Sequence, residues 1–263
     1  LVWDKPSPWI GKEDIEEARR LDPIGAEFAR LWEGRWISGR GGAVDNFSID
    51  RCFRSEKHEG KENGFIYIAG MDLGINRDHS GVVVVGVNPL EQVVKVVSVN
   101  EWVPSVPNDN GTLEVDIFDV ERTCIEEWKK WGIVWFGYDP AAGGSILSQR
   151  LRKKGLPMRE VSFSNPKNLS EMATSFVVLV KSGKLECYEH PSLRRDFGKF
   201  EIEHKPPNLY KLKAVSDQYG HADVGTALVI CLPIAMKLLK GLSFGGDVED
   251  FICYCGVWDG KES

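Results

Sequence analysis

The clearest pattern in the sequence is a series of apolar runs between residues 65 and 103. The runs at 65–71, 80–87 and 93–103 are rich in Val and Ile, and short turns separate them. Strands joined by such short turns are antiparallel neighbours. The pattern therefore predicts a meander of three antiparallel strands.

A helical pattern follows. Five apolar side chains recur at helical spacing, namely Ile117, Val120, Cys124, Trp128 and Trp131. Gly132 is a suitable residue to end this helix. The apolar run 133–139 then reads as a buried strand. Because a helix connects it to the meander, we expect it to lie parallel to the first strand.

The second half of the chain continues the alternation. We predict a helix over 143–155, a short strand over 156–163, and a helix to about residue 183 capped by Asn168 or Ser170. The strongest helical pattern covers 221–240. This order of elements is that of RNase H-like domains. The prediction is an α/β fold with an RNase H-like mixed five-stranded sheet flanked by helices.

The two ends of the chain differ from its middle. Residues 1–60 combine helical spacing with a Gly-rich stretch at 38–47, which predicts a linker before the domain at 61–243. The tail 244–263 is rich in Gly and acidic residues, and we expect it to be poorly ordered. The chain begins at Leu1 without a Met, so we expect a fragment of a longer polypeptide.

Composition describes an ordinary soluble globular protein, with 263 residues, 42% hydrophobic and 27% charged. The longest apolar run, 227–236, is too short to span a bilayer. The six cysteines are scattered, which favours buried free thiols in a reducing compartment. The sequence contains no phosphate-loop motif of the G-x-x-x-x-G-K-[ST] type.

Charge is distributed unevenly. The net charge is −6, yet the stretch from Arg150 to Lys213 has 14 Lys and Arg against 7 Asp and Glu. A basic segment inside an acidic protein indicates either a local surface for a polyanion or a set of solvated helix faces.

Three carboxylates stand at the ends of predicted elements. Asp72 ends the first strand, Asp139 ends the strand expected beside it, and Asp223 stands at the start of the last helix. Neighbouring strands are about 4.8 Å apart, so the first two carboxylates would face each other. Carboxylate oxygens suit Mg²⁺ or Mn²⁺, and two such ions support phosphodiester hydrolysis.

Each of these residues also has a purely structural interpretation. Asp72 precedes a Gly-containing turn, Asp139 precedes a proline, and Asp223 favours a helix N-terminus. Any one of them is explained equally well as a turn or capping residue. The functional interpretation depends on all three meeting at one place.

Three motifs together resemble the nuclease domain of tailed-bacteriophage terminase large subunits. They are "GMDLGINRDHSGVVVVGV" (70–87), "VWFGYDPAAGG" (134–144) and "GHADVGTALVICL" (220–232). The upstream stretch "FARLWEGRWISGRGGAVDNFSIDRCF" (28–53) is similar to the segment that leaves the ATPase motor domain of that family. The resemblance covers most of the chain from about residue 9 to 240.

The resemblance implies a metal-dependent endodeoxyribonuclease, a hydrolase that cuts concatemeric viral DNA during genome packaging. Asp72, Asp139 and Asp223 match the family's catalytic, metal-binding acids, which hold two Mg²⁺ or Mn²⁺ ions. The implied partners are double-stranded DNA, the missing motor domain, the portal and the small terminase subunit. The implied location of the protein is the cytoplasm of the host and not the mature virion. One departure concerns Ala222, which stands where relatives often have a further acid.

The basic segment is the expected contact for DNA, because clustered carboxylates by themselves repel phosphate. The candidate DNA-binding residues are Arg150, Arg152, Lys153, Lys154, Arg194, Arg195 and Lys199. Two other functions remain open from the sequence. One is an actin-like ATPase or sugar-kinase-type phosphotransferase, whose first strand also ends in Asp-x-Gly. The other is a non-catalytic packaging or docking module whose acids bind structural cations.

Overall fold

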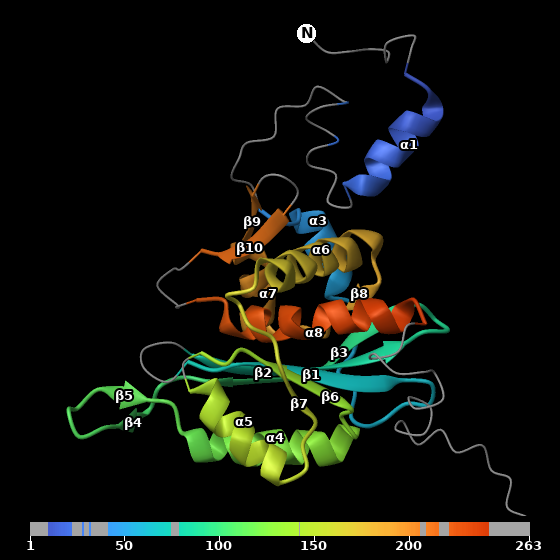
Figure 1. Ribbon diagram of the computed structural model, residues 1–263. Coiled ribbons are helices and arrows are strands. Elements are labelled where there is room, and N and C mark those ends of the chain that lie inside the picture. The colour runs from blue at the N-terminus through green and yellow to red at the C-terminus, as the bar shows by residue number, and fades with distance from the viewer. Residues whose placement is uncertain are drawn as a thin grey trace, which may run out of the picture.

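A six-stranded mixed sheet forms the centre of the protein, in the order β7-β6-β1-β2-β3-β8 (Figure 1). The computed structural model describes residues 10–22, 28, 32, 42–74, 79–141, 143–205, 209–215 and 221–241. The strands of the sheet are β1 (Ile66–Asp72), β2 (Ser80–Asn88), β3 (Val93–Trp102), β6 (Trp135–Tyr138), β7 (Met158–Glu160) and β8 (Leu185–Glu186).

The pairing of the strands confirms the predicted meander. β1 pairs antiparallel with β2, and β2 pairs antiparallel with β3. β6 lies parallel to β1, as expected for a strand reached through a helix, and β7 lies parallel to β6. The expected number of five strands is wrong by one, because β8 adds a sixth strand parallel to β3. β8 has two residues, too few to show strand periodicity in the sequence.

Helices cover both faces of the sheet (Figure 1). The described helices are α1 (Lys12–Leu21), α3 (Asn46–Cys52), α4 (Ile117–Trp131), α5 (Gly144–Lys153), α6 (Pro166–Ser182), α7 (Pro191–Lys199) and α8 (Asp223–Leu239), of which α1 lies away from the sheet. α4 and α5 pack on one face, where Phe136 and Trp131 belong to one apolar core. α6, α7 and α8 cover the other face, where Ile68 and Phe176 belong to a second core.

The helix ends follow local capping chemistry. The Asp116 side chain accepts hydrogen bonds from the N–H groups of Phe118 and Asp119 at the start of α4, and Gly132, with φ of 62°, ends it. The expected cap of α6 at Asn168 or Ser170 is wrong. Asn165 is the N-cap, because Pro166 fits the first helical position and its missing N–H costs nothing there.

The long helix α8 lies directly on the sheet because the strands below it have glycines at the crossing points. A Cβ atom at Gly70 of β1 would lie 2.0 Å from the carbonyl oxygen of Ala227. A Cβ atom at Gly137 of β6 would lie 2.6 Å from Cγ2 of Ile230. Side chains at these positions would lift the helix, so glycine sets its height above the sheet.

Two small ribbons stand outside the main sheet. β9 (Phe200–Lys205) and β10 (Leu209–Ala214) form an antiparallel hairpin, with β10 beside α6 (Figure 1). β4 (Val106–Pro107) pairs with β5 (Leu113–Glu114). The sequence pattern predicted neither of these pairs.

The N-terminal segment is partly built into the fold. Ile49, Cys52 and Phe53 in and after α3 belong to the core under α6 and α8. The backbone N–H of Ala43 donates to the carbonyl of Phe200 at 2.6 Å. Part of the segment that was expected to be a linker is therefore packed against the domain. The predicted tail at 244–263 lies outside the described residues.

The described ranges contain four of the six cysteines and the helices of the fold. The described cysteines, Cys52, Cys124, Cys187 and Cys231, are buried free thiols. Of the helices in this part of the chain, none is long and apolar enough to cross a membrane.

Candidate functional site

Asp72 and Asp139 lie at the same edge of the sheet because β1 and β6 are parallel and in register. Met71 is aligned with Tyr138, so the next positions along the two strands are Asp72 and Asp139. Side chains alternate between the faces of a strand. Gly70 and Gly137, two residues earlier in each strand, face α8. Both aspartates therefore belong to the face that α8 covers.

Asp223 reaches this edge from above. Asp72 pairs with Gly81 across β1 and β2. A Cβ atom at Gly81 would lie 2.8 Å from the carbonyl oxygen of Asp223, so the first residue of α8 sits over the strand position beside Asp72. The backbone positions of the three acids that the sequence singled out therefore lie at one edge of the sheet, on two strands and one helix.

The environment of Asp139 disfavours its negative charge. Burial raises the pKa of Asp139 above its ordinary value, and the nearby charge of Glu160 acts in the same direction. Hydrogen bonds from the backbone N–H groups of Phe163, at 3.1 Å from Oδ1, and of Ala141 oppose this shift. A bound cation would stabilise this carboxylate.

The donor set fits a hard divalent ion. Asp72, Asp139 and Asp223 offer carboxylate oxygens, and Asp223 is buried with only 7% of its surface exposed. Within the described ranges, however, no group of three His, Cys, Asp or Glu side chains is close enough together to hold a metal ion. The fit to a metal ion therefore rests on the backbone placement of these acids and on the chemistry of their carboxylates.

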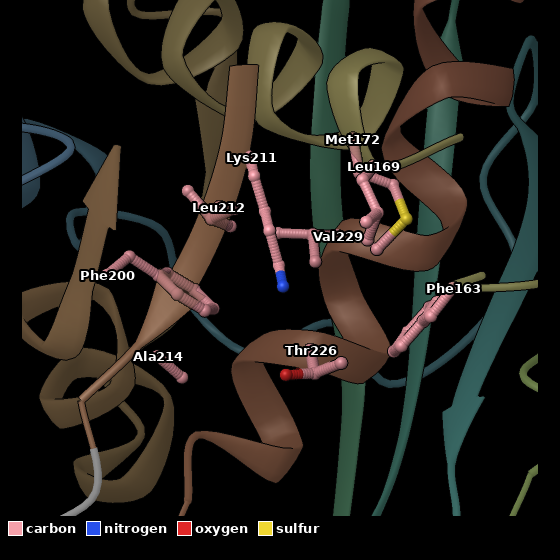
Figure 2. A pocket seen from close by; sticks show the side chains of 9 residues that line it. All are labelled: Phe163, Leu169, Met172, Phe200, Lys211, Leu212, Ala214, Thr226 and Val229. Carbon is pink, nitrogen blue, oxygen red and sulfur yellow. The ribbon is translucent and has the colours of Figure 1, made fainter. Parts of the chain in front are cut away.

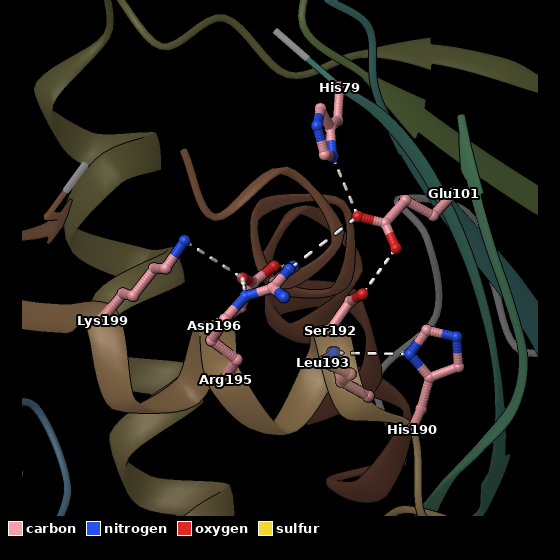
Figure 3. A network of polar contacts seen from close by, with 9 residues as sticks. His79, Glu101, His190, Ser192, Leu193, Arg195, Asp196 and Lys199 are labelled. Atoms are coloured by element: carbon pink, nitrogen blue, oxygen red, sulfur yellow. Dashed lines mark hydrogen bonds and ion pairs between the residues drawn. The ribbon is translucent and has the colours of Figure 1, made fainter. Parts of the chain in front are cut away.

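A fourth acid, Glu101 of β3, is aligned with Asp72 across the sheet. The sequence analysis did not identify it as a candidate. Glu101 pairs with Gly81, which places it two strands away from Asp72. Its Oε1 lies 3.0 Å from Nδ1 of His79, and its Oε2 accepts a hydrogen bond of 2.5 Å from Ser192 (Figure 3). Burial alone would raise the pKa of Glu101, but the bonds from Ser192 and His79 and the charge of Arg195 outweigh it and lower the pKa.

A fifth acid, Asp196 of α7, is almost completely buried, with 1% of its surface exposed. Its Oδ2 accepts a hydrogen bond of 3.0 Å from the backbone N–H of Gly225 in α8. Burial, and to a smaller extent the charge of Asp223, raise the pKa of Asp196 to about 6 against the opposing effects of the hydrogen bond from Gly225 and the charges of Lys199 and Arg195. Asp196 lies within a helix, where no sequence signal connects it to the other acids.

The predicted DNA-binding residues of α5 lie on the face of the sheet that α4 covers. Arg150 Nη2 lies 2.6 Å from Oε2 of the buried Glu121, and Lys154 Nζ lies 3.1 Å from its Oε1. Arg152 donates to the hydroxyls of Tyr138 and Ser148. Lys153 is exposed.

The predicted DNA-binding residues of α7 lie on the opposite face. Arg194 pairs with Asp50 at 2.6 Å and with Glu189 at 2.8 Å. Arg195 lies near Glu101 and Asp196 (Figure 3). Lys199 is only 7% exposed, which excludes it from a surface that contacts DNA in this conformation. The two basic clusters therefore lie on opposite faces of the sheet and do not form one continuous surface.

A cavity of about 160 Å³ opens between α6, β10 and α8 (Figure 2). Its lining consists of Phe163, Leu169, Met172, Phe200, Lys211, Leu212, Ala214, Thr226 and Val229. The lining is mostly apolar, and the ammonium group of Lys211 points into the space in Figure 2. Phe163, whose N–H holds Asp139, and Thr226, one turn after Asp223, connect this cavity to the acidic edge.

Comparison with known proteins identifies the fold. No protein-family model and no curated protein matches the chain. The large terminase nuclease from thermophilic phage G20c matches with a TM-score of 0.54 and 13% identity, over 70% of this chain and 94% of that one. The HK97 bacteriophage large terminase matches with a TM-score of 0.60 and 16% identity, over 87% of this chain.

A third match, the P22 large terminase nuclease domain, has a TM-score of 0.50 and 12% identity, over 74% of this chain and 91% of that one. The G20c nuclease has also been solved with bound magnesium and with bound cobalt. This chain spans about half of the HK97 protein, 52% of its length. At these identities the likeness shows the fold. It is that of the RNase H-like nuclease domains of tailed-phage large terminases, as the sequence motifs led us to expect.

Proposed function

We propose that this chain is the nuclease part of a tailed-phage large terminase and that it cuts double-stranded DNA with the help of divalent metal ions. The observation that carries the proposal is the meeting of Asp72, Asp139 and Asp223 at one edge and on one face of the sheet. A turn or capping role explains each acid alone. Such roles do not explain why three elements present acids at one place.

In this proposal Asp72, Asp139 and Asp223 hold two Mg²⁺ or Mn²⁺ ions. When bound, such ions lower the pKa of a water molecule that attacks the phosphodiester and stabilise the charge on the leaving oxygen. The chain itself fixes the ligands. Backbone N–H groups of Phe163 and Ala141 donate to the carboxylate of Asp139 and hold it in place. Asp223 stands in the first turn of α8, at the positive end of the helix dipole.

We propose that DNA reaches this edge beside α5. That helix begins five residues after Asp139, and its last turn contains Arg150, Arg152 and Lys153. Exposed cations on this helix would bind phosphates without reading sequence, and the affinity would fall as the salt concentration rises. Arg194 and Arg195 are secondary candidates, because they lie on the other face of the sheet from α5.

The biological role follows from the same proposal. The chain would cut concatemeric viral DNA during genome packaging, in the host cytoplasm, as part of a longer protein with an ATPase motor domain. The portal and the small terminase subunit would be its further partners. The likeness to the HK97 large terminase, of which this chain spans 52%, supports this arrangement.

A non-catalytic docking module is the second candidate. In that case the acids would bind a structural cation without cleavage. The other alternative, an actin-like ATPase or sugar-kinase-type phosphotransferase, has no support from the solved structures that share this fold.

Plasmid cleavage by the purified chain tests the proposal. Supercoiled DNA is incubated with Mg²⁺, with Mn²⁺ and with EDTA, and nicked and linear products are quantified. The matched control is Asp109→Ala, because Asp109 is an exposed turn residue in the β4–β5 ribbon. We expect cleavage only with metal, its loss in Asp72→Ala and Asp139→Ala, and its retention in Asp109→Ala. Cleavage in EDTA would exclude the metal mechanism, and folded protein without any cleavage would favour the docking module.

A further inference from the structure

The helix that carries Asp223 begins without a cap of its own. Its N-cap position is Ala222, whose methyl side chain cannot accept a hydrogen bond. α4 and α6, in contrast, are capped by Asp116 and Asn165, which directly precede them. Since Ala222 is fully buried, the N–H groups of the first turn of α8 need an acceptor from the protein.

Asp196 of α7 supplies that acceptor. Its Oδ2 receives the N–H of Gly225 at 3.0 Å. Gly225 is the third residue of α8, the position whose N–H an N-cap side chain ordinarily binds. The approach is close, because a Cβ atom at Gly225 would lie 2.9 Å from Cβ of Asp196. Glycine at this position lets α7 come near enough to cap its neighbour.

Asp196 is itself held in place through α7 (Figure 3). Ser192 donates to Glu101 of β3 at 2.5 Å, and Arg195 Nη2 lies 4.0 Å from the same carboxylate. Lys199 Nζ and Arg195 Nε lie 4.0 Å and 3.9 Å from Oδ1 of Asp196. These contacts connect the sheet to α7 and α7 to the first turn of α8.

We propose that Asp196 is the N-cap of α8, supplied from another helix, and that it is thereby a positioning residue for Asp223. Asp223 lies two residues before Gly225, so loss of the cap would loosen the turn that holds it. The role of Asp223 as a metal ligand rests on the function proposed above, whereas the capping role does not.

Three variants of Asp196 test the inference. Asp196→Ala removes the acceptor, and Asp196→Asn keeps an acceptor oxygen while removing the charge. The third variant is the double change Asp196→Ala with Ala222→Ser, which places a capping hydroxyl at the position preceding α8. Asp45→Ala is the control, because Asp45 caps α3 by the same kind of bond, 2.8 Å from the N–H of Ser48, away from the acids.

Two measurements are made on each variant. The first is hydrogen exchange at residues 223–226 without metal. The second is the affinity for Mn²⁺, taken from the rise in melting temperature as Mn²⁺ is added. We expect faster exchange in Asp196→Ala, and a loss of Mn²⁺ affinity of about 10- to 100-fold, as for residues that orient metal ligands. Asp196→Asn and the double variant should recover most of both properties, and Asp45→Ala should change neither.

The outcomes separate the possible failures. Unchanged exchange in Asp196→Ala would overturn the capping role. Faster exchange with unchanged Mn²⁺ affinity would leave a cap but overturn the positioning of Asp223. Loss of affinity in Asp196→Asn equal to that in Asp196→Ala would show that the charge of Asp196 binds the ion directly. No Mn²⁺ response in the unmodified protein would reject the proposed function, while the exchange measurement would still decide the cap.

Discussion

The contact between α8 and the sheet offers the most quantitative prediction, through the substitution Gly81→Ala. The added Cβ atom would lie 2.8 Å from the carbonyl oxygen of Asp223, whereas ordinary contact begins near 3.4 Å. The start of α8 must therefore retreat by about 0.6 Å. The opposing atoms belong to the backbone, so no side chain can rotate away to make room.

Overpacking of this kind costs about 1–3 kcal/mol of the free energy of unfolding. For a domain of this size, the melting temperature should fall by about 2–12 °C. Displacement of Asp223 from Asp72 should also reduce cleavage by about tenfold to a hundredfold, because a misplacement of about 1 Å in a catalytic group has such effects.

Gly→Ala substitutions at two further positions allow the loss of stability in Gly81→Ala to be ranked. At Gly70 the added atom would lie 2.0 Å from the carbonyl oxygen of Ala227, so Gly70→Ala should be more destabilising than Gly81→Ala. At Gly198, in α7, no described atom lies within 4 Å of the added carbon, so Gly198→Ala should be neutral or slightly stabilising. Urea denaturation and calorimetry give the ranking, and plasmid nicking gives the activity. Equal stability of all three variants would refute the close seating of α8 on the sheet.

Three other predictions concern the acids and the cations. Asp72→Ala, Asp139→Ala and Asp223→Ala should each lose most cleavage. Their melting temperatures without metal should equal or exceed that of the unmodified protein, since removal of an anion relieves repulsion. Retained cleavage in Asp72→Ala or Asp139→Ala would contradict the site. Because the pKa of Asp196 is raised to about 6 in the folded state, its contribution to stability is present below pH 3.8 and declines as the pH rises toward 6. Relative to Asp196→Asn, the unmodified protein should therefore lose up to about 3 kcal/mol over that range in urea titrations, and parallel pH profiles of the two proteins would reject this. Lys153→Glu should weaken DNA binding, measured by fluorescence anisotropy, and should make the affinity for DNA depend less on salt concentration. The rise in melting temperature with Mn²⁺ should stay unchanged. Unchanged DNA affinity at low salt would mean that DNA binds elsewhere.

Local sequence determined a large part of this fold. The meander β1–β3, the helix α4 and the strand β6 follow from apolar periodicity, and they appear where the pattern predicted them. The same pattern put Asp72, Asp139 and Asp223 at the ends of elements. The placement of Asp72 and Asp139 at one edge was predictable because parallel neighbouring strands bring their carboxyl ends to the same edge of a sheet.

Only the tertiary structure decided the surroundings of these acids. β8 and the β9–β10 hairpin are short, and their strands were not predicted from the sequence. Their pairing depends on tertiary contacts. The register between β2 and β3 aligns Glu101 with Gly81 and so with the edge where Asp72 lies. Asp196 contacts α8 from a separate helix. The basic residues of α5 and α7 belong to the same basic segment of the sequence, but the two helices lie on opposite faces of the sheet. Charge along a chain does not specify on which side each helix packs, because that choice is made by the apolar faces that the helices bury.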